Sequence, residues 1–232
     1  MVVLGLSEMP KAMLSLPIGF GKNESGYLPV VVQGLLPNQN LLVTQNGQWV
    51  ADYIPLYYRT MPFKLAKNPE GSIILCVDHD SGLVTDAPAG YQFFESEGKL
   101  TAETNAVAQQ LMQFEGERAK SRELCQLLDK LCVIEPWVLQ LQHGDNIQEV
   151  EGLYRINEKK LMELSAEHLA EVRNAGGLML CYAQLFSMQH MQQLGTVAQR
   201  QHWAAKVAES AGSKVQALNI VEDNGIISFA NL

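Results

Sequence analysis

The residues best suited to chemistry lie close together, between Glu115 and Arg122. At helical periodicity, Arg118 and Ser121 project on the same stripe as apolar neighbours, with Glu115 and Arg122 at its edge. An arginine that faces a core must find a partner, because a buried unpaired charge is very costly. Two interpretations follow: a structural ion-pair network, or a polar pocket for an anion or a carboxylate-bearing ligand, which arginine can bind through two hydrogen bonds.

A second acidic group, Asp78-His79-Asp80, ends a predicted strand. Strand alternation puts the two carboxylates on one face, where they could bind a cation, act as acid and base, or pair with Arg118. Glu135 is a further candidate partner for that arginine. The spacing D-x-D-S-G is similar to the start of a calcium loop, but the required downstream glutamate is missing. A turn or a salt bridge at the strand end is the alternative.

Two aromatic and basic pairs are candidate interaction surfaces. Tyr57 and Arg59 share a face if the proline-bounded segment around them is extended. Tyr154 and Arg155 repeat the same residue types on another predicted strand. Tyrosine and arginine are enriched in interface hot spots. The alternative for both pairs is aromatic packing beside a solvated arginine.

Motifs of familiar catalytic or metal chemistry are missing from the sequence. It contains no C-x-x-C, H-x-x-x-H or H-x-H pair, no G-x-S-x-G and no glycine-rich phosphate loop. We therefore predict no metal site, and we assign no cofactor and no catalytic residue. Four cysteines are predicted to be small buried side chains in a reducing compartment. They are Cys76, Cys125, Cys132 and Cys181.

Composition indicates a globular chain with an acidic balance. Its 232 residues carry a net charge of −8, and the pI is near 5.1. Binding to nucleic acid is therefore disfavoured. The first residues do not resemble a secretory signal peptide. Residues 174–199 lack charged side chains, but glutamines interrupt them, which favours a buried helix over a membrane span. We expect a cytoplasmic protein, with surface association as the alternative.

The elements that must position these residues form an α+β fold. Apolar runs at 16–20 and 27–35 flank a polar loop, and turn signals predict further hairpins. We expect an antiparallel, partly curved sheet or partial barrel, packed against one long helix and one buried central helix. The chain is predicted to be a single domain over 1–232, with 1–99, mainly β, and 100–232, mixed, as alternative subdomains. The further hairpin turns are expected at Asn46-Gly47, 68–71, 143–146 and Asn224-Gly225.

Helices are predicted mainly in the second half of the chain. The long helix begins after Thr101, its N-cap, and ends before Pro136. A short helix follows over 157–164, and a longer one, capped by Ser165, is expected to run through Gly176-Gly177 to about residue 193. A more polar helix is predicted over 199–209. The long loop 80–99 precedes these helices, and its aromatic residues expected to pin it to the core are Tyr91, Phe93 and Phe94.

Several segments, taken in order, carry a resemblance to a known family. They are ADYIPLYYRTMPFKL (51–65), SIILCVDHDSGLV (72–84), FEGER (114–118), IEPWVLQL (134–141), EGLYRINEKKLMELS (151–165) and LCYAQLFSM (180–188). In this order they resemble the SapC family of bacterial proteins, over roughly residues 4–194. The family is named for an association with bacterial surface layers. The resemblance implies an accessory protein, supplies no catalytic residues, and implies a flavin-dependent halogenase-like neighbour as a partner.

These observations predict a protein- or small-ligand-binding accessory module. Its partner would be another protein or a small acidic ligand, and neither nucleic acid nor a membrane span is expected. The first alternative is an enzyme, or the partner of one, that uses a buried Asp/Arg pocket. The second is a surface-layer component. The candidate ligand-binding residues are Arg118, Arg122, Glu115, Ser121, Asp78 and Asp80, and the candidate interaction residues are Tyr57, Arg59, Tyr154 and Arg155.

Overall fold

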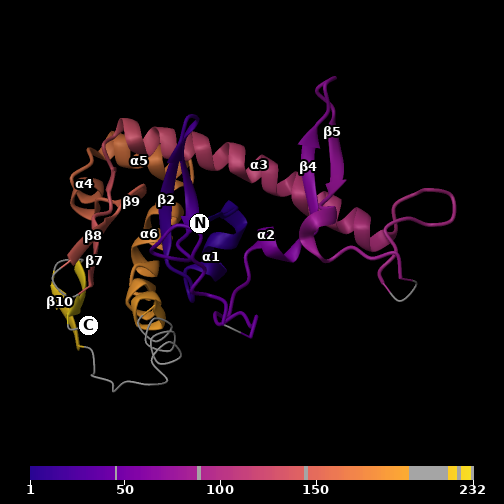
Figure 1. Ribbon diagram of the computed structural model, residues 1–232. Helices are drawn as coiled ribbons and strands as arrows, with labels where there is room; N and C mark the ends of the chain where they lie inside the picture. The colour runs from indigo at the N-terminus through magenta and orange to yellow at the C-terminus, as the bar shows by residue number, and fades with distance from the viewer. Residues whose placement is uncertain (45, 88–89, 144–145, 199–218, 224–225, 231–232) are drawn as a thin grey trace, which may run out of the picture.

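A five-stranded antiparallel sheet forms the centre of the molecule. The computed structural model describes residues 1–232 except 45, 88–89, 144–145, 199–218, 224–225 and 231–232 (Figure 1). Strands from both sides of residue 100 share this sheet, in the order β1-β3-β2-β9-β6. They are β1 (Val2–Val3), β2 (Ile18–Asn23), β3 (Gly26–Val31), β6 (Ile134–Pro136) and β9 (Leu153–Ile156).

Two smaller sheets complete the β structure. The predicted α+β fold is confirmed, but the sheets are open and no barrel closes. One sheet is a two-stranded hairpin of β4 (Phe63–Lys67) and β5 (Ile73–Val77). The other has the order β10-β11-β7-β8, in which β11 runs parallel to β7. Its strands are β7 (Leu139–His143), β8 (Asn146–Val150), β10 (Asn219–Asp223) and β11 (Ile226–Ala230).

Most of the predicted hairpins form. The β2–β3 pair turns at residues 24–25, and Gly26 adopts the positive φ that such a turn favours. The pairs β4–β5, β7–β8 and β10–β11 confirm three more hairpins. Around Asn46-Gly47, an isolated bridge joins Val43 to Trp49, and backbone hydrogen bonds run from Thr44 to Gln48 at 2.8 Å and from Val50 to Leu42 at 2.9 Å, so the chain folds back here without an assigned pair of strands among the described residues. That segment therefore lies outside the named strands.

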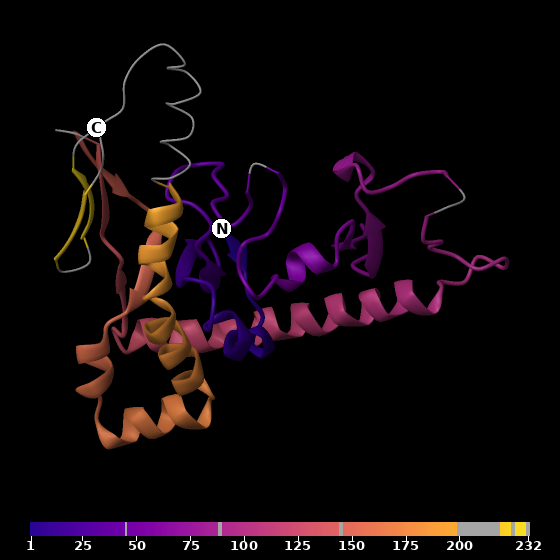
Figure 2. The same ribbon diagram turned by 90° about the horizontal axis from the view of Figure 1, so that it is seen from below.

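The long helix α3 (Ala102–Lys130) crosses the whole molecule (Figure 2). Thr101 caps it as predicted, because its hydroxyl accepts a hydrogen bond from the Thr104 amide at 3.3 Å. Only the second half of the helix reaches the main core, where its buried side chains meet the sheet and α6 (Gly177–Ser187). The α3 residues in the main core are Leu124, Cys125 and Leu128.

The helix expected from Ser165 to about residue 193 is broken. Gly176 takes a φ of +84°, which ends α5 (Ala166–Asn174) and lets α6 start in a new direction. One face of α6 is buried as expected, but Met179 and Phe186 are exposed on the other. A further helical segment covers 190–198, whereas the helix predicted over 199–209 falls outside the described residues.

The remaining elements are short. At the N-terminus, η1 (Leu6–Glu8) and α1 (Met9–Ala12) pack near α3 and α6. The helix predicted over 157–164 is confirmed as α4 (Glu158–Met162), which Asn157 caps. The two other short helical elements, which bracket the β4–β5 hairpin, are α2 (Leu56–Arg59) and η2 (His79–Ser81).

Candidate functional site

Arg118 and Glu115 of α3 pair with each other within their own helix. The Arg118 Nη1 atom donates to Glu115 Oε1 at 2.6 Å, and both side chains are partly exposed, at 31% and 46%. The prediction that Asp78, Asp80 or Glu135 neutralises Arg118 is therefore wrong. The carboxylate that pairs with the Arg118 guanidinium is that of Glu115, about one helical turn away.

Asp78 and Asp80 belong to the end of the β4–β5 hairpin. Asp78 forms an ion pair with Lys64 at 2.7 Å, and this neighbouring ammonium lowers the pKa of the Asp78 carboxyl. The other Asp78 oxygen accepts from the Asp80 amide, which is the turn considered as the alternative. Within the described residues, no hydrogen bond or ion pair joins these two aspartates to Arg118 or Arg122.

Three polar atoms on α3 remain without partners among the described residues. Ser121 is fully buried, and its Oγ makes no hydrogen bond there. The Nε atoms of Arg118 and Arg122 are likewise buried and unpaired. Unsatisfied buried donors are rare in proteins and call for an explanation. A bound ligand would be one such explanation, although all three atoms are shielded from solvent.

The segment with Tyr57 and Arg59 is helical, so the predicted shared strand face does not exist. Pro55 precedes α2, and consecutive side chains there point about 100° apart rather than to alternating faces. Tyr57 is exposed, while Tyr58 turns inward and accepts a hydrogen bond from Gln33. Arg59 lies along the chain, where its Nε donates to the Ile54 carbonyl at 3.0 Å.

The second aromatic and basic pair lies on β9. Tyr154 packs edge-on against Tyr27, with ring centroids 4.8 Å apart. Arg155 donates through Nε to Glu135 at 2.9 Å, and Asn157 donates to the other oxygen of the same carboxylate. Glu135 is thus the partner of Arg155 rather than of Arg118. Arg155 also lines a hollow of about 530 Å³ beside the stacked rings of Tyr182 and Phe186.

A buried carboxylate that the sequence analysis missed fixes the start of α2. Glu8 is 4% exposed, and its Oε1 accepts from the Tyr53 hydroxyl at 2.8 Å and the Leu56 amide at 2.7 Å. Burial, with the nearby Glu8 carboxylate, raises the pKa of Tyr53 to about 12. The only signal in the sequence is an acidic residue in a mostly apolar first segment.

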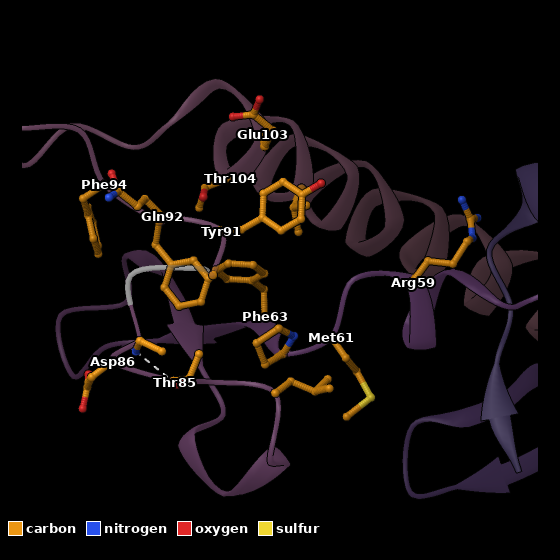
Figure 3. A pocket seen from close by; sticks show the side chains of 16 residues that line it. Arg59, Met61, Phe63, Thr85, Asp86, Tyr91, Gln92, Phe94, Glu103 and Thr104 are labelled. Carbon is orange, nitrogen blue, oxygen red and sulfur yellow. Dashed lines mark hydrogen bonds between the residues drawn. The ribbon is translucent and has the colours of Figure 1, made fainter. Parts of the chain in front are cut away.

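A cavity lies at the N-terminal end of α3, in a part that we call the arm. The arm comprises the β4–β5 hairpin, residues 78–101 and the first turns of α3, 102–112. The cavity has a volume of about 930 Å³ and is lined mostly by aromatic and aliphatic side chains. Figure 3 shows Phe63 and Tyr91 among the residues that line it, with Glu103 and Thr104 of the first turn of α3 above them.

The loop of the arm is only partly pinned. Phe93 packs edge-on against Phe63, with ring centroids 4.9 Å apart. Tyr91 and Phe94, which were expected to anchor the loop as well, are 89% and 55% exposed. That expectation is wrong because no other element of the described chain covers this side of the arm.

The arm has little core of its own. Ile73 and Ile74 are adjacent on β5 and therefore point to opposite faces, yet both are exposed. Both faces of the hairpin are thus open to solvent near its turn, whereas Phe63, Leu65 and Leu75 further along are half-buried. Ala108 and Leu111, in the α3 part of the arm, are buried, but they do not belong to the main core. Figures 1 and 2 show the hairpin standing on α3 away from the five-stranded sheet.

Comparison with known proteins gives one match. A family model described as SapC covers residues 1–194, which is most of the chain. This chain belongs to the SapC family. The matched residues contain the whole arm and the five-stranded sheet and reach into the last described helix. No curated protein matches this SapC chain, and no solved structure does.

Two further properties of the SapC chain bear on its site. Among its described residues, no helix is both long and apolar enough to cross a bilayer. In that same part of the chain, no three histidine, cysteine or acidic side chains are grouped to hold a metal ion. The arm cavity and the α3 donors are therefore the features from which a function can be argued.

Proposed function

We propose that this SapC protein is an accessory module that docks onto another protein through its arm. The observation that carries the proposal is the exposure of apolar side chains on both faces of the β4–β5 hairpin near its turn. An isolated two-stranded hairpin is marginally stable in water, and a contiguous exposed apolar surface marks an interaction site. The exposed apolar side chains of the arm are Ile73, Ile74, Leu83, Tyr91, Phe94 and Met112.

Docking would give this surface the cover that the chain itself does not supply. Side chains such as Ile73 gain about 1.5–3 kcal/mol each when fully buried. The hairpin also has unpaired edges, which can accept a strand of a partner. An accessory role, rather than an enzymatic one, is supported by the engagement of Arg59, Arg118 and Arg155 in pairs within the chain.

Site-specific photo-crosslinking in the native host tests this proposal. A benzophenone amino acid replaces Ile73 in the arm or, as a matched control, Met162, which is 71% exposed on α4. We expect one discrete crosslinked product from position 73 and none from position 162. The product should be lost when Ile74→Ser is added. Equal crosslinking at both positions, or none at position 73, would contradict docking through the arm.

Binding of a small anion along α3 is a second candidate. It is favoured by the unpaired Ser121 Oγ and the unpaired Nε atoms of Arg118 and Arg122. It ranks below the arm because these atoms are shielded. Sulfate or acetate, compared with chloride at equal ionic strength, should raise the melting temperature of the wild type more than that of Arg122→Gln. Equal shifts in both proteins would exclude this site.

A further inference from the structure

The arm cavity combines aromatic rings with carboxylates, and this combination favours a positively charged ligand group. We propose that the cavity receives a basic side chain, arginine or lysine, carried by an apolar segment of the protein partner. This inference rests on the proposed docking role of the arm and adds the chemistry of the partner. Arg59 is the arginine that lines this cavity, and it is already engaged by other groups of the chain.

The rings supply the first half of the argument. Phe63, Tyr91, Phe93 and Phe94 all line the cavity, and the Tyr91 ring is almost fully exposed. The faces of aromatic rings carry partial negative charge and attract ammonium and guanidinium groups within about 6 Å. The long aliphatic stems of lysine and arginine also pack well on apolar walls. An aromatic cavity that is open to solvent therefore suits a basic side chain.

The carboxylates supply the second half. Asp86 and Glu103 line the cavity at opposite edges of the ring cluster (Figure 3), and neither has an ion-pair partner among the described residues. The only cation of the lining, Arg59, lies away from the rings and is already bound to Ile54, Tyr53 and Glu8. An incoming cation thus meets uncompensated negative charge.

The sequence around the cavity extends this acidic field. Between residues 78 and 103 the sequence has six acidic side chains and a single lysine, Lys99, which Glu97 pairs at 2.9 Å. Lys64 of β4 pairs Asp78, so the charges nearest the cavity are those of Asp86 and Glu103. A second copy of this chain, with its own net charge of −8, would bring like charges together. An anionic ligand would be repelled in the same way. The acidic residues are Asp78, Asp80, Asp86, Glu95, Glu97 and Glu103.

Three matched tripeptides test the proposal on the full-length protein. They are acetyl-Leu-X-Leu-amide with X as arginine, glutamine or glutamate, titrated while the backbone amide shifts of Glu103, Thr104 and Val107 are followed by NMR. We expect the arginine peptide to bind at least about tenfold more tightly than the glutamate peptide at low salt. Raising the salt from about 20 to 200 mM should shrink this ratio several-fold, since exposed charges are screened.

Two variants assign the preference to the cavity. Asp86→Asn with Glu103→Gln should bring the three peptides to within about threefold of one another. The control Glu70→Gln, an exposed carboxylate in the hairpin turn outside the cavity lining, should keep the wild-type preference. Tyr91→Ser, which changes an exposed side chain, should weaken the arginine peptide more than the glutamine peptide.

The outcomes separate this inference from the docking role. If position 73 crosslinks to a partner but the three peptides bind equally or not at all, the basic side chain is wrong and docking stands. If crosslinking fails and the arginine preference is present, the cavity is a cation site without a docked protein, and the inference as stated is overturned. If both fail, both proposals are wrong.

Discussion

Burial divides the four cysteines into two chemical classes. Cys125 and Cys181 are fully buried, and burial raises the pKa of each thiol to about 12. Cys132 is exposed, because it takes a φ of +56° just after α3 and leaves the apolar stripe, and Cys76 is half-buried. The prediction that all four are buried is therefore wrong for two of them.

This division predicts the order of alkylation in the native protein. At about pH 8, iodoacetamide should modify Cys132 first and Cys76 more slowly, because only accessible thiols that can ionise react. Cys125 and Cys181 should react only after unfolding in guanidinium chloride. Peptide mass spectrometry measures each site. Labelling of Cys125 in the native state at the rate of Cys132 would show that the core is open.

The raised pKa of Tyr53 predicts that the folded state loses stability at alkaline pH. Its pKa is raised from an ordinary value of 10.0 to about 12 in the folded protein, first by burial and then by Glu8. The folded state therefore holds the phenol proton more tightly than the unfolded state does. The stability that this linkage provides is complete below about pH 10 and is lost as the pH rises towards 12.

The corresponding test compares urea unfolding between about pH 9 and 11. Tyr53→Phe should be less stable than the wild type at the lower pH, because it loses the hydrogen bond to Glu8. It should nevertheless show a smaller fall in unfolding free energy over this range. Tyr91→Phe, altered in an exposed ring, serves as the control and should follow the wild type. Parallel curves for all three proteins would rule out the role of Tyr53.

Among the elements, α6 acts as a polar partner for two strand ends. The buried Gln184 side chain accepts from the Ile156 amide of β9 at 2.9 Å and donates to the Ile18 carbonyl of β2 at 3.2 Å. The Ser187 hydroxyl accepts from the Ile18 amide at 3.0 Å. A helix thus satisfies backbone groups of Ile18 and Ile156 at the ends where β2 and β9 no longer pair with each other.

Removing this link should be costly. Gln184→Leu leaves the Ile156 amide without a partner in the core and leaves the Ile18 carbonyl only the longer 3.4 Å contact with the Ser187 hydroxyl, at about 1–3 kcal/mol for each group. We expect a loss of roughly 2–5 kcal/mol in the free energy of unfolding, measured with urea. The control Gln192→Leu alters an exposed glutamine in the next helical segment and should change stability by less than about 0.5 kcal/mol. A similar small effect at Gln184 would contradict this role.

In the whole molecule, stability should fall along α3 from the core to the arm. The second half of α3 contributes Leu124 and Leu128 to the main core, whereas the buried apolar residues of its first half are the small side chain Ala108 and Leu111, beside the buried Thr104. Local opening free energies follow such differences in buried contacts. The arm is therefore expected to open without unfolding the body.

Hydrogen–deuterium exchange measures this gradient in the isolated protein. Amides of β4, β5 and the first two turns of α3 should exchange at least about a hundredfold faster than those of β2, β3 and residues 121–128. A bound partner should slow exchange in the arm and leave the body unchanged. Equal protection along all of α3 would show that the arm is as stable as the core.

Local patterns were sufficient for much of the fold. The β2–β3 and β4–β5 turns, the Thr101 cap and the Ser165 cap were all predicted, because each depends on residues a few positions apart. The prediction for the α2 segment was wrong because its alternating residue types resemble those of a strand, whereas Pro55 and the contact with Glu8 select a helical turn. The break at Gly176 was not predicted, because a glycine can lie within a helix as well as end one.

The sequence by itself determined the fold class, the family and most element positions, since turn chemistry, capping and apolar periodicity act over short distances. Only the tertiary structure decided which polar and apolar groups are covered. Glu8 meets Tyr53 across 45 positions and Gln184 meets Ile18 across 166, while Ile73, Ile74 and Tyr91 stay exposed in the part of the chain that the structure describes. An apolar residue in a sequence looks the same in either case, because burial depends on a second element that periodicity does not specify.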